Sequence, residues 1–142
     1  MKFISLSHYI HFLVVKQMPT HLDPKILFEM FHNLAYLEIT CGSRHRGENY
    51  CREGFGMKLS DAEAISFSLR STNRLITLSL PCNLIDIEII KILIKGFLIN
   101  SSITSLDLSY NSLDDDCAQK LAGYLLKSRS IVELKLNENM VH

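Results

Sequence analysis

Three residues of one glycine-rich stretch, Cys41, His45 and Cys51, are of types that could bind a metal ion. Thiolate and imidazole groups are the preferred ligands of zinc in proteins. The spacings C-x3-H and H-x5-C are loose, however, and the stretch supplies no fourth ligand. We therefore expect neither a metal site nor any other cofactor in this chain.

Three consecutive carboxylates, Asp114, Asp115 and Asp116, could attract a cation. They directly precede an amphipathic segment, and carboxylates at a helix start are favoured by capping and by the helix dipole. We predict that the triplet begins a helix and binds no metal.

Catalysis by an activated nucleophile finds no pattern in this sequence. The six histidines are scattered, and no GxSxG or Walker A motif is present. We predict that the chain is not an enzyme and has no small-molecule substrate. An enzyme whose site is assembled only in space is the alternative.

The elements that would position such residues follow from an internal repeat. Three segments fit the pattern LxxLxLxxNxL, namely residues 75–85, 103–113 and 131–141. Their asparagines, Asn83, Asn111 and Asn139, are separated by 28 residues each time. Alternation in LxL predicts a strand with one buried side, and an amide after the strand can satisfy loop backbone groups. We expect the three asparagines to form a structural ladder between stacked units.

The second half of each unit predicts a helix. Ile65, Leu93 and Leu121 are also 28 apart and belong to apolar stripes at helical spacing. Helices are predicted at about 60–71, 87–98 and 115–127, with Ser60, Asp86 and Asp114 or Asp116 as N-caps. An earlier copy of the strand begins at Leu34, with Gly42 at the asparagine position and an insertion at about 43–56.

The predicted fold class is α/β, a leucine-rich-repeat solenoid (a horseshoe segment) over residues 34–142. About four parallel strands would line its concave face, with helices on its convex face. A leading helix is expected within 18–33, where Asp23 can cap and Pro24 can take the first helical position. The chain stops directly after a strand, so we expect a fragment, a truncated product, or an end that a partner covers.

The apolar segment 1–17 is unassigned. It resembles a signal peptide, but His8 and His11 interrupt it and no small-residue cleavage site follows. A strand or helix packed on the end of the solenoid, or a segment foreign to the domain, are the other readings.

Binding of another protein is the function that the composition leaves open. Lys plus Arg and Asp plus Glu both number 15, so no basic excess points to nucleic acid. No apolar run is long enough to span a membrane. The four cysteines form no CxxC pair, which favours a reduced, cytoplasmic protein.

The binding residues are predicted on two surfaces. Solvent-facing strand positions of the concave face are Tyr36, Glu38, Ser79, Asp107 and Lys135. The insertion loop supplies Arg44, Arg46, Tyr50, Arg52 and Phe55, of which arginine and tyrosine are common interface anchors.

The 28-residue unit, with asparagine after the strand and a full helix, resembles the ribonuclease-inhibitor-like class of leucine-rich repeats. Over about 18–142 the chain also resembles the family of dynein regulatory complex subunit 5 (T-complex-associated testis-expressed protein 1). The matching stretches are 21–24 (HLDP), 31–37 (FHNLAYL), 84–86 (LID) and 100–109 (NSSITSLDLS). The family's Gly-Met-Asn-Phe-like stretch corresponds to 46–50 (RGENY), where Glu48 and Tyr50 replace its Met and Phe.

This resemblance implies a structural subunit of the nexin–dynein regulatory complex, bound to other subunits in the axoneme of motile cilia or flagella. The family has more repeats than this chain contains. The alternative is a generic cytosolic leucine-rich-repeat adaptor or inhibitor, such as a regulator of small GTPases or immune receptors.

Overall fold

A computed structural model describes residues 6–19, 22–41 and 56–140. Within these residues the fold is α/β, with a parallel sheet of five strands and four helices. The strands are β1 (Phe12–Lys16), β2 (Tyr36–Thr40), β3 (Thr77–Ser79), β4 (Ser105–Asp107) and β5 (Glu133–Lys135). The helices are α2 (Lys25–Met30), α3 (Leu59–Ser68), α4 (Ile87–Ile99) and α5 (Asp115–Leu125).

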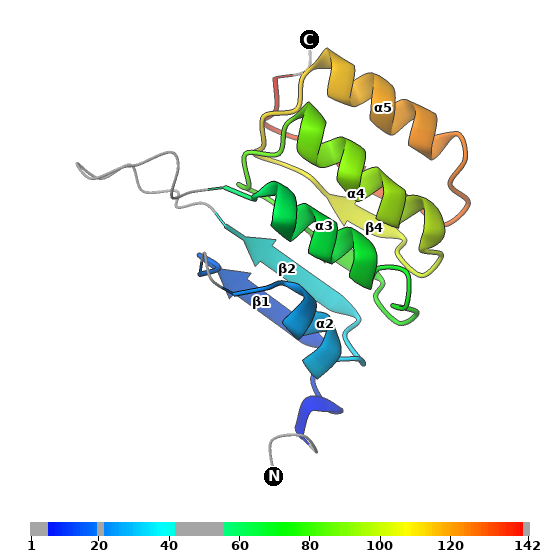
Figure 1. The fold of residues 1–142 in the computed structure, drawn as a ribbon. Coiled ribbons are helices and arrows are strands. Elements are labelled where there is room, and N and C mark those ends of the chain that lie inside the picture. The colour runs from blue at the N-terminus through cyan, green and yellow to red at the C-terminus, as the bar shows by residue number, and fades with distance from the viewer. Residues whose placement is uncertain (1–5, 20–21, 42–55, 141–142) are drawn as a thin grey trace, which may run out of the picture.

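The strands lie in the sheet in the order in which they occur along the chain, and every neighbouring pair is parallel (Figure 1). Thr77 pairs with Ser105 and Ser105 pairs with Glu133, so the predicted 28-residue register of these strands is confirmed. Tyr36 pairs with Thr77, 41 residues later. The extra 13 residues therefore lie between paired strands without shifting the register.

The helices cover one face of the sheet, and the core fills the space between the two layers (Figure 1). Leu37, Leu78 and Leu106 point inward from consecutive strands and are fully buried. Ile65 and Leu93 of the predicted helical stripes are also fully buried. Burying each such side chain stabilises the fold by about 1.5–3 kcal/mol, so this alternating pattern sets which side of the sheet the helices occupy.

Strand β1 is the main difference from the expected count of about four strands. It comes from the unassigned segment 1–17, which thus includes a strand packed on the end of the sheet. Its alternating pattern turns Leu13 and Val15 toward the core, and it pairs with β2 from Phe12 through Lys16.

Helix α2 is shorter than the predicted leading helix and occupies a different place. We predicted that it would cover an edge of the sheet, but β1 covers the edge of β2, and α2 lies beside α3 (Figure 1). The Asp23 carboxylate accepts a hydrogen bond from the Lys25 amide at 2.9 Å, as expected of a capping residue. The helix ends at Met30 because the chain must leave it to enter β2 at Tyr36.

Capping explains where the longer helices begin. Asp86 accepts hydrogen bonds from two amides of the first turn of α4, and Asp114 accepts one from the Cys117 amide of α5, so both predicted caps are confirmed. The prediction of Ser60 for α3 is wrong. That helix starts one residue earlier, and the Asp61 carboxylate accepts from the Lys58 amide at 3.0 Å.

The asparagines at the ends of the strands connect neighbouring units. The Asn83 amide donates to Asn111 Oδ1 at 2.9 Å, and the Asn111 amide donates to Asn139 Oδ1 at 3.1 Å. Asn111 Nδ2 donates back to the carbonyl of Leu80, 31 residues earlier. Because backbone groups inside the coil cannot reach water, these amides replace the solvent for them.

A second set of bonds joins the units at their opposite end. Asn100, after α4, donates through Nδ2 to the carbonyls of Leu69 and Thr72, while its Oδ1 accepts from the Ile103 amide. Residues 28 positions away are Thr72 and Ser128, which also have polar side chains. The repeat analysis did not single out this position, although its polar periodicity was a usable signal.

Candidate functional site

The face of the sheet turned away from the helices, here called the open face, gathers the candidate binding residues. Alternation places every second strand residue on it. Its members are Phe12, Val14, Lys16, Tyr36, Glu38, Thr40, Thr77, Ser79, Ser105, Asp107, Glu133 and Lys135. The register aligns Glu38, Ser79, Asp107 and Lys135 in one row across the strands, which is the row that the sequence predicts.

Ser79 differs from the prediction, because it was expected to face solvent and only 3% of it is exposed. Its short side chain lies between Glu38 and Asp107 on the adjacent strands, which are longer. Ser79 therefore forms the floor of the open face between two carboxylates. The other predicted residues of the row are half-buried or exposed.

Tyr36 is held by two contacts on this face. Its hydroxyl donates a hydrogen bond to Glu38 Oε2 at 2.8 Å. Its ring stacks on that of Phe12, with 4.2 Å between centroids and 11° between the planes. Burial, followed by the hydrogen bond and charge of Glu38, raises the pKa of the Tyr36 hydroxyl, so Tyr36 remains a neutral donor to the carboxylate.

Phe12 was absent from the predicted site, and 63% of it is exposed. Its place follows from the pairing of β1 with β2, which sets Phe12 opposite Tyr36. The alternating apolar pattern of residues 12–16 was the available signal, but it did not reveal which strand this segment would join.

The far end of the open face has a charge pair of its own. Lys135 Nζ lies 3.7 Å from Glu133 Oε1, and Ser105 Oγ donates to Glu133 Oε2 at 2.7 Å. Exposed pairs of this kind contribute only about 0–1 kcal/mol. The pair nevertheless shows where the Lys135 charge is directed, which is along its own strand.

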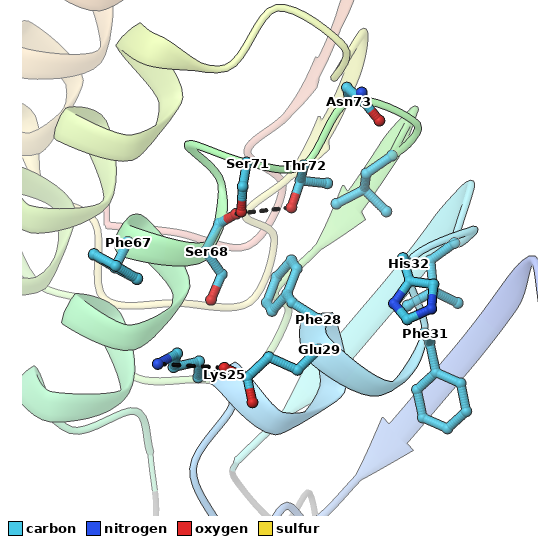
Figure 2. A pocket seen from close by; sticks show the side chains of 12 residues that line it. Lys25, Phe28, Glu29, Phe31, His32, Phe67, Ser68, Ser71, Thr72 and Asn73 are labelled. Atoms are coloured by element: carbon cyan, nitrogen blue, oxygen red, sulfur yellow. Dashed lines mark hydrogen bonds and ion pairs between the residues drawn. The ribbon is translucent and has the colours of Figure 1, made fainter. Parts of the chain in front are cut away.

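A second hollow lies between α2 and α3, on the helix side of the sheet (Figure 2). Its volume is about 440 Å³. Lys25 pairs with Glu29 at 3.3 Å and places its Nζ 5.5 Å from the centre of the Phe67 ring. Phe28 points into the hollow from α2 (Figure 2). The hollow exists because α2 is six residues long and covers only part of the flank of the ten-residue α3.

The hydroxyl groups around this hollow are not arranged for nucleophilic chemistry. Ser68 Oγ donates to the Ala64 carbonyl, and both Ser71 Oγ and Thr72 Oγ1 donate to the Ser68 carbonyl. A nucleophile would need to donate to a base such as His32. The bonds described here give these hydroxyls a structural role at the end of α3.

The residues considered for metal binding are placed only in part. Burial, with a smaller contribution from Asp61, raises the pKa of the Cys41 thiol to about 12, which disfavours the thiolate that a metal needs. His45 and Cys51 lie outside the described residues, as do the insertion residues Arg44, Arg46, Tyr50, Arg52 and Phe55. Within the described ranges, no group of three or more His, Cys, Asp or Glu side chains could hold a metal ion.

The aspartates at the start of α5 act on their own helix. The hydrogen bond from the Cys117 amide lowers the pKa of the Asp114 carboxyl, while Asp115 and Asp116 lie in the first turn. Among the described helices, none has the length and apolar character needed to cross a membrane.

No protein-family model matches the chain. Among solved structures it is similar to one described as leiomodin-1 actin-binding site 2, with a TM-score of 0.56 and 15% sequence identity. That similarity covers 72% of this chain and 53% of the other, and it concerns the fold alone.

Among characterised proteins, dynein regulatory complex subunit 5 of Chlamydomonas reinhardtii is 36% identical over 103 residues. These residues are 72% of this chain and 19% of the relative, so the match spans about a fifth of the relative's length. The chain is thus a homologue, at moderate identity, of a segment of dynein regulatory complex subunit 5.

Proposed function

We propose that the chain is a leucine-rich-repeat solenoid of the ribonuclease-inhibitor-like class. The support is the repeated unit itself: parallel strands in a 28-residue register, each ending at an asparagine that bonds to the next unit. Neighbouring units of a solenoid bury edges that one unit cannot bury alone. The bonds between Asn83, Asn111 and Asn139 have this character.

We further propose that this solenoid is a non-catalytic, protein-binding scaffold in the nexin–dynein regulatory complex of motile cilia or flagella. The observation that carries the proposal is the 36% identity to dynein regulatory complex subunit 5. Its partners would be other protein subunits of that complex, and its location would be the cytoskeleton of the axoneme. No nucleic acid, membrane or small-molecule ligand enters this proposal.

The open face is the surface that we assign to partner binding. The helices cover the opposite side of the sheet, so the open face is the side on which strand side chains meet solvent (Figure 1). It combines an exposed aromatic ring at Phe12 with the carboxylates of Glu38 and Asp107. Aromatic anchors ringed by polar groups are typical of protein interfaces.

Detergent extraction of motile ciliated cells that express the tagged chain tests this function. We expect the tagged chain to stay with the axonemes after the membranes are dissolved, while the tag alone is released. Release of the folded chain into the soluble fraction would contradict an axonemal scaffold and would favour a cytosolic adaptor instead.

A further inference from the structure

We propose that the open face recognises a basic, arginine-bearing segment of its protein partner, which pairs with the carboxylates of Glu38 and Asp107. This inference rests on the proposed function, because it assigns a partner chemistry to the same surface. Three features of the face support it: its local charge, its exposed aromatic pair, and the spacing of its two carboxylates.

The three central strands carry acids and no base on this face. Outward positions of β2, β3 and β4 hold Glu38 and Asp107, and the rest are uncharged. The bases of the face stand on the outer strands, Lys16 on β1 and Lys135 on β5. Lys135 is directed to Glu133, 3.7 Å away. The centre of the face is thus locally negative although the whole chain is neutral.

Each central carboxylate has capacity left for a partner. Glu38 Oε2 accepts from the Tyr36 hydroxyl, and Asp107 Oδ1 accepts from the Ser109 amide. Among the described residues, neither carboxylate has a Lys, Arg or His nitrogen within salt-bridge distance. Since an ionised carboxylate can accept about four hydrogen bonds, a guanidinium group could pair with either one.

The aromatic pair favours arginine over lysine. Phe12 and Tyr36 form a stack directly beside Glu38, and most of Phe12 is exposed. A planar guanidinium stacks on aromatic rings while it binds a carboxylate through two parallel hydrogen bonds. An ammonium group cannot combine both contacts in this way.

The spacing of the carboxylates suits a segment rather than a single residue. Glu38 and Asp107 are separated by one intervening strand, so their backbones lie about 10 Å apart. Alternate side chains of an extended peptide are about 7 Å apart. The length of arginine side chains covers the difference, and the buried Ser79 between the carboxylates leaves the path unobstructed.

The test is a titration of the isotope-labelled 142-residue chain with the peptide acetyl-(Arg-Ala)4-amide, followed by NMR. We expect shifts at the amides of β2, β3 and β4, and weaker binding of the matching lysine peptide. The double variant Glu38→Gln with Asp107→Asn should bind about tenfold more weakly. The control variant Glu63→Gln with Glu88→Gln, on exposed helix positions, should bind like the wild type.

Equal binding by the Glu38→Gln/Asp107→Asn variant, shifts confined to the helices, or no binding of the peptide would overturn the inference. The variant's own spectrum verifies its fold. Axonemal retention of the same variants separates the two proposals. If wild type and the variant are retained equally, the arginine inference fails and the scaffold function stands. If wild type is released while peptide binding still needs both carboxylates, the scaffold function fails and the inference stands.

Discussion

Replacement of Asn111 by alanine would remove the most connected side chain of the asparagine ladder. Asn111 Oδ1 accepts from the amides of Asn83 and Ile85, at 2.9 and 3.1 Å. Its Nδ2 donates to the carbonyls of Leu80 and Leu108 at 2.9 and 3.0 Å. Alanine would leave all of these backbone groups without this partner.

The two amides determine the size of the effect. Asn83 and Ile85 have no exposed surface, so water cannot simply take the place of the lost oxygen. An orphaned buried donor costs about 1–3 kcal/mol, and the carbonyls each retain a second lone pair. We therefore expect Asn111→Ala to lower the free energy of unfolding by about 2–5 kcal/mol. Domains of this size have about 5–15 kcal/mol in total.

Urea denaturation followed by circular dichroism measures this loss. With a slope of about 1–3 kcal/mol per molar urea, the midpoint should fall by at least about 1 M. The Asn139→Ala variant should lose less, because Asn139 is half-buried and water can reach its partners. The exposed Asn137→Ala is the control, with a change within about 0.5 kcal/mol. Equal midpoints for Asn111→Ala and Asn137→Ala would refute the argument that the ladder stabilises the fold.

Three further predictions concern packing, backbone strain and ionisation. Gly96→Ala should destabilise the fold by about 1–3 kcal/mol in urea, because its Cβ would lie 2.7 Å from the backbone of α3. Gly123→Ala, with nothing within 4 Å, should instead stabilise it by about 0.5–1 kcal/mol. Glu138→Gly should raise the unfolding midpoint, because Glu138 has a φ of 56° and relief of that strain stabilises by about 1 kcal/mol; an unchanged midpoint would speak against strain. Burial raises the pKa of the Cys41 thiol to about 12 and of the Cys117 thiol to about 11, so the stability from these protonated thiols is complete below the unfolded pKa of about 8.5 and is lost as the pH rises toward 11–12. Iodoacetamide with mass spectrometry should label both cysteines at pH 8.5 only after urea is added, and rapid labelling of the folded chain would contradict their burial.

Much of the α/β architecture could be predicted because equivalent residues recur at equal intervals. Asn83, Asn111 and Asn139 each follow a strand by the same distance, so one register determined three units. The caps at Asp86 and Asp114 are local signals that depend on a few neighbouring residues. Such features need no knowledge of the rest of the molecule.

The features that were missed depend on contacts outside the repeated pattern. Strand β1 has no asparagine at its end, and only its pairing with β2 identifies it as part of the sheet. Cys82, Tyr110 and Glu138 all have a positive φ, although no glycine marks these turns. They directly precede the ladder asparagines, whose hydrogen bonds hold the turns in place.

The candidate site was predicted as a row but not as a surface with relief. Strand alternation correctly places Glu38, Ser79, Asp107 and Lys135 side by side. It does not account for side-chain length, which buries Ser79 between its longer neighbours. Phe12 was missed for the same reason as β1, and with it the aromatic edge of the open face.

Photo-crosslinking in axonemes tests the central claim most directly, namely that the open face binds a partner subunit. The tagged chain would carry p-benzoylphenylalanine at Thr77, in the middle of the open face, or at Glu63, exposed on α3. After irradiation and mass spectrometry, we predict that the Thr77 position is joined to another subunit of the dynein regulatory complex and the Glu63 position is not. Crosslinks to such a subunit from Glu63 alone, or none from Thr77, would contradict it.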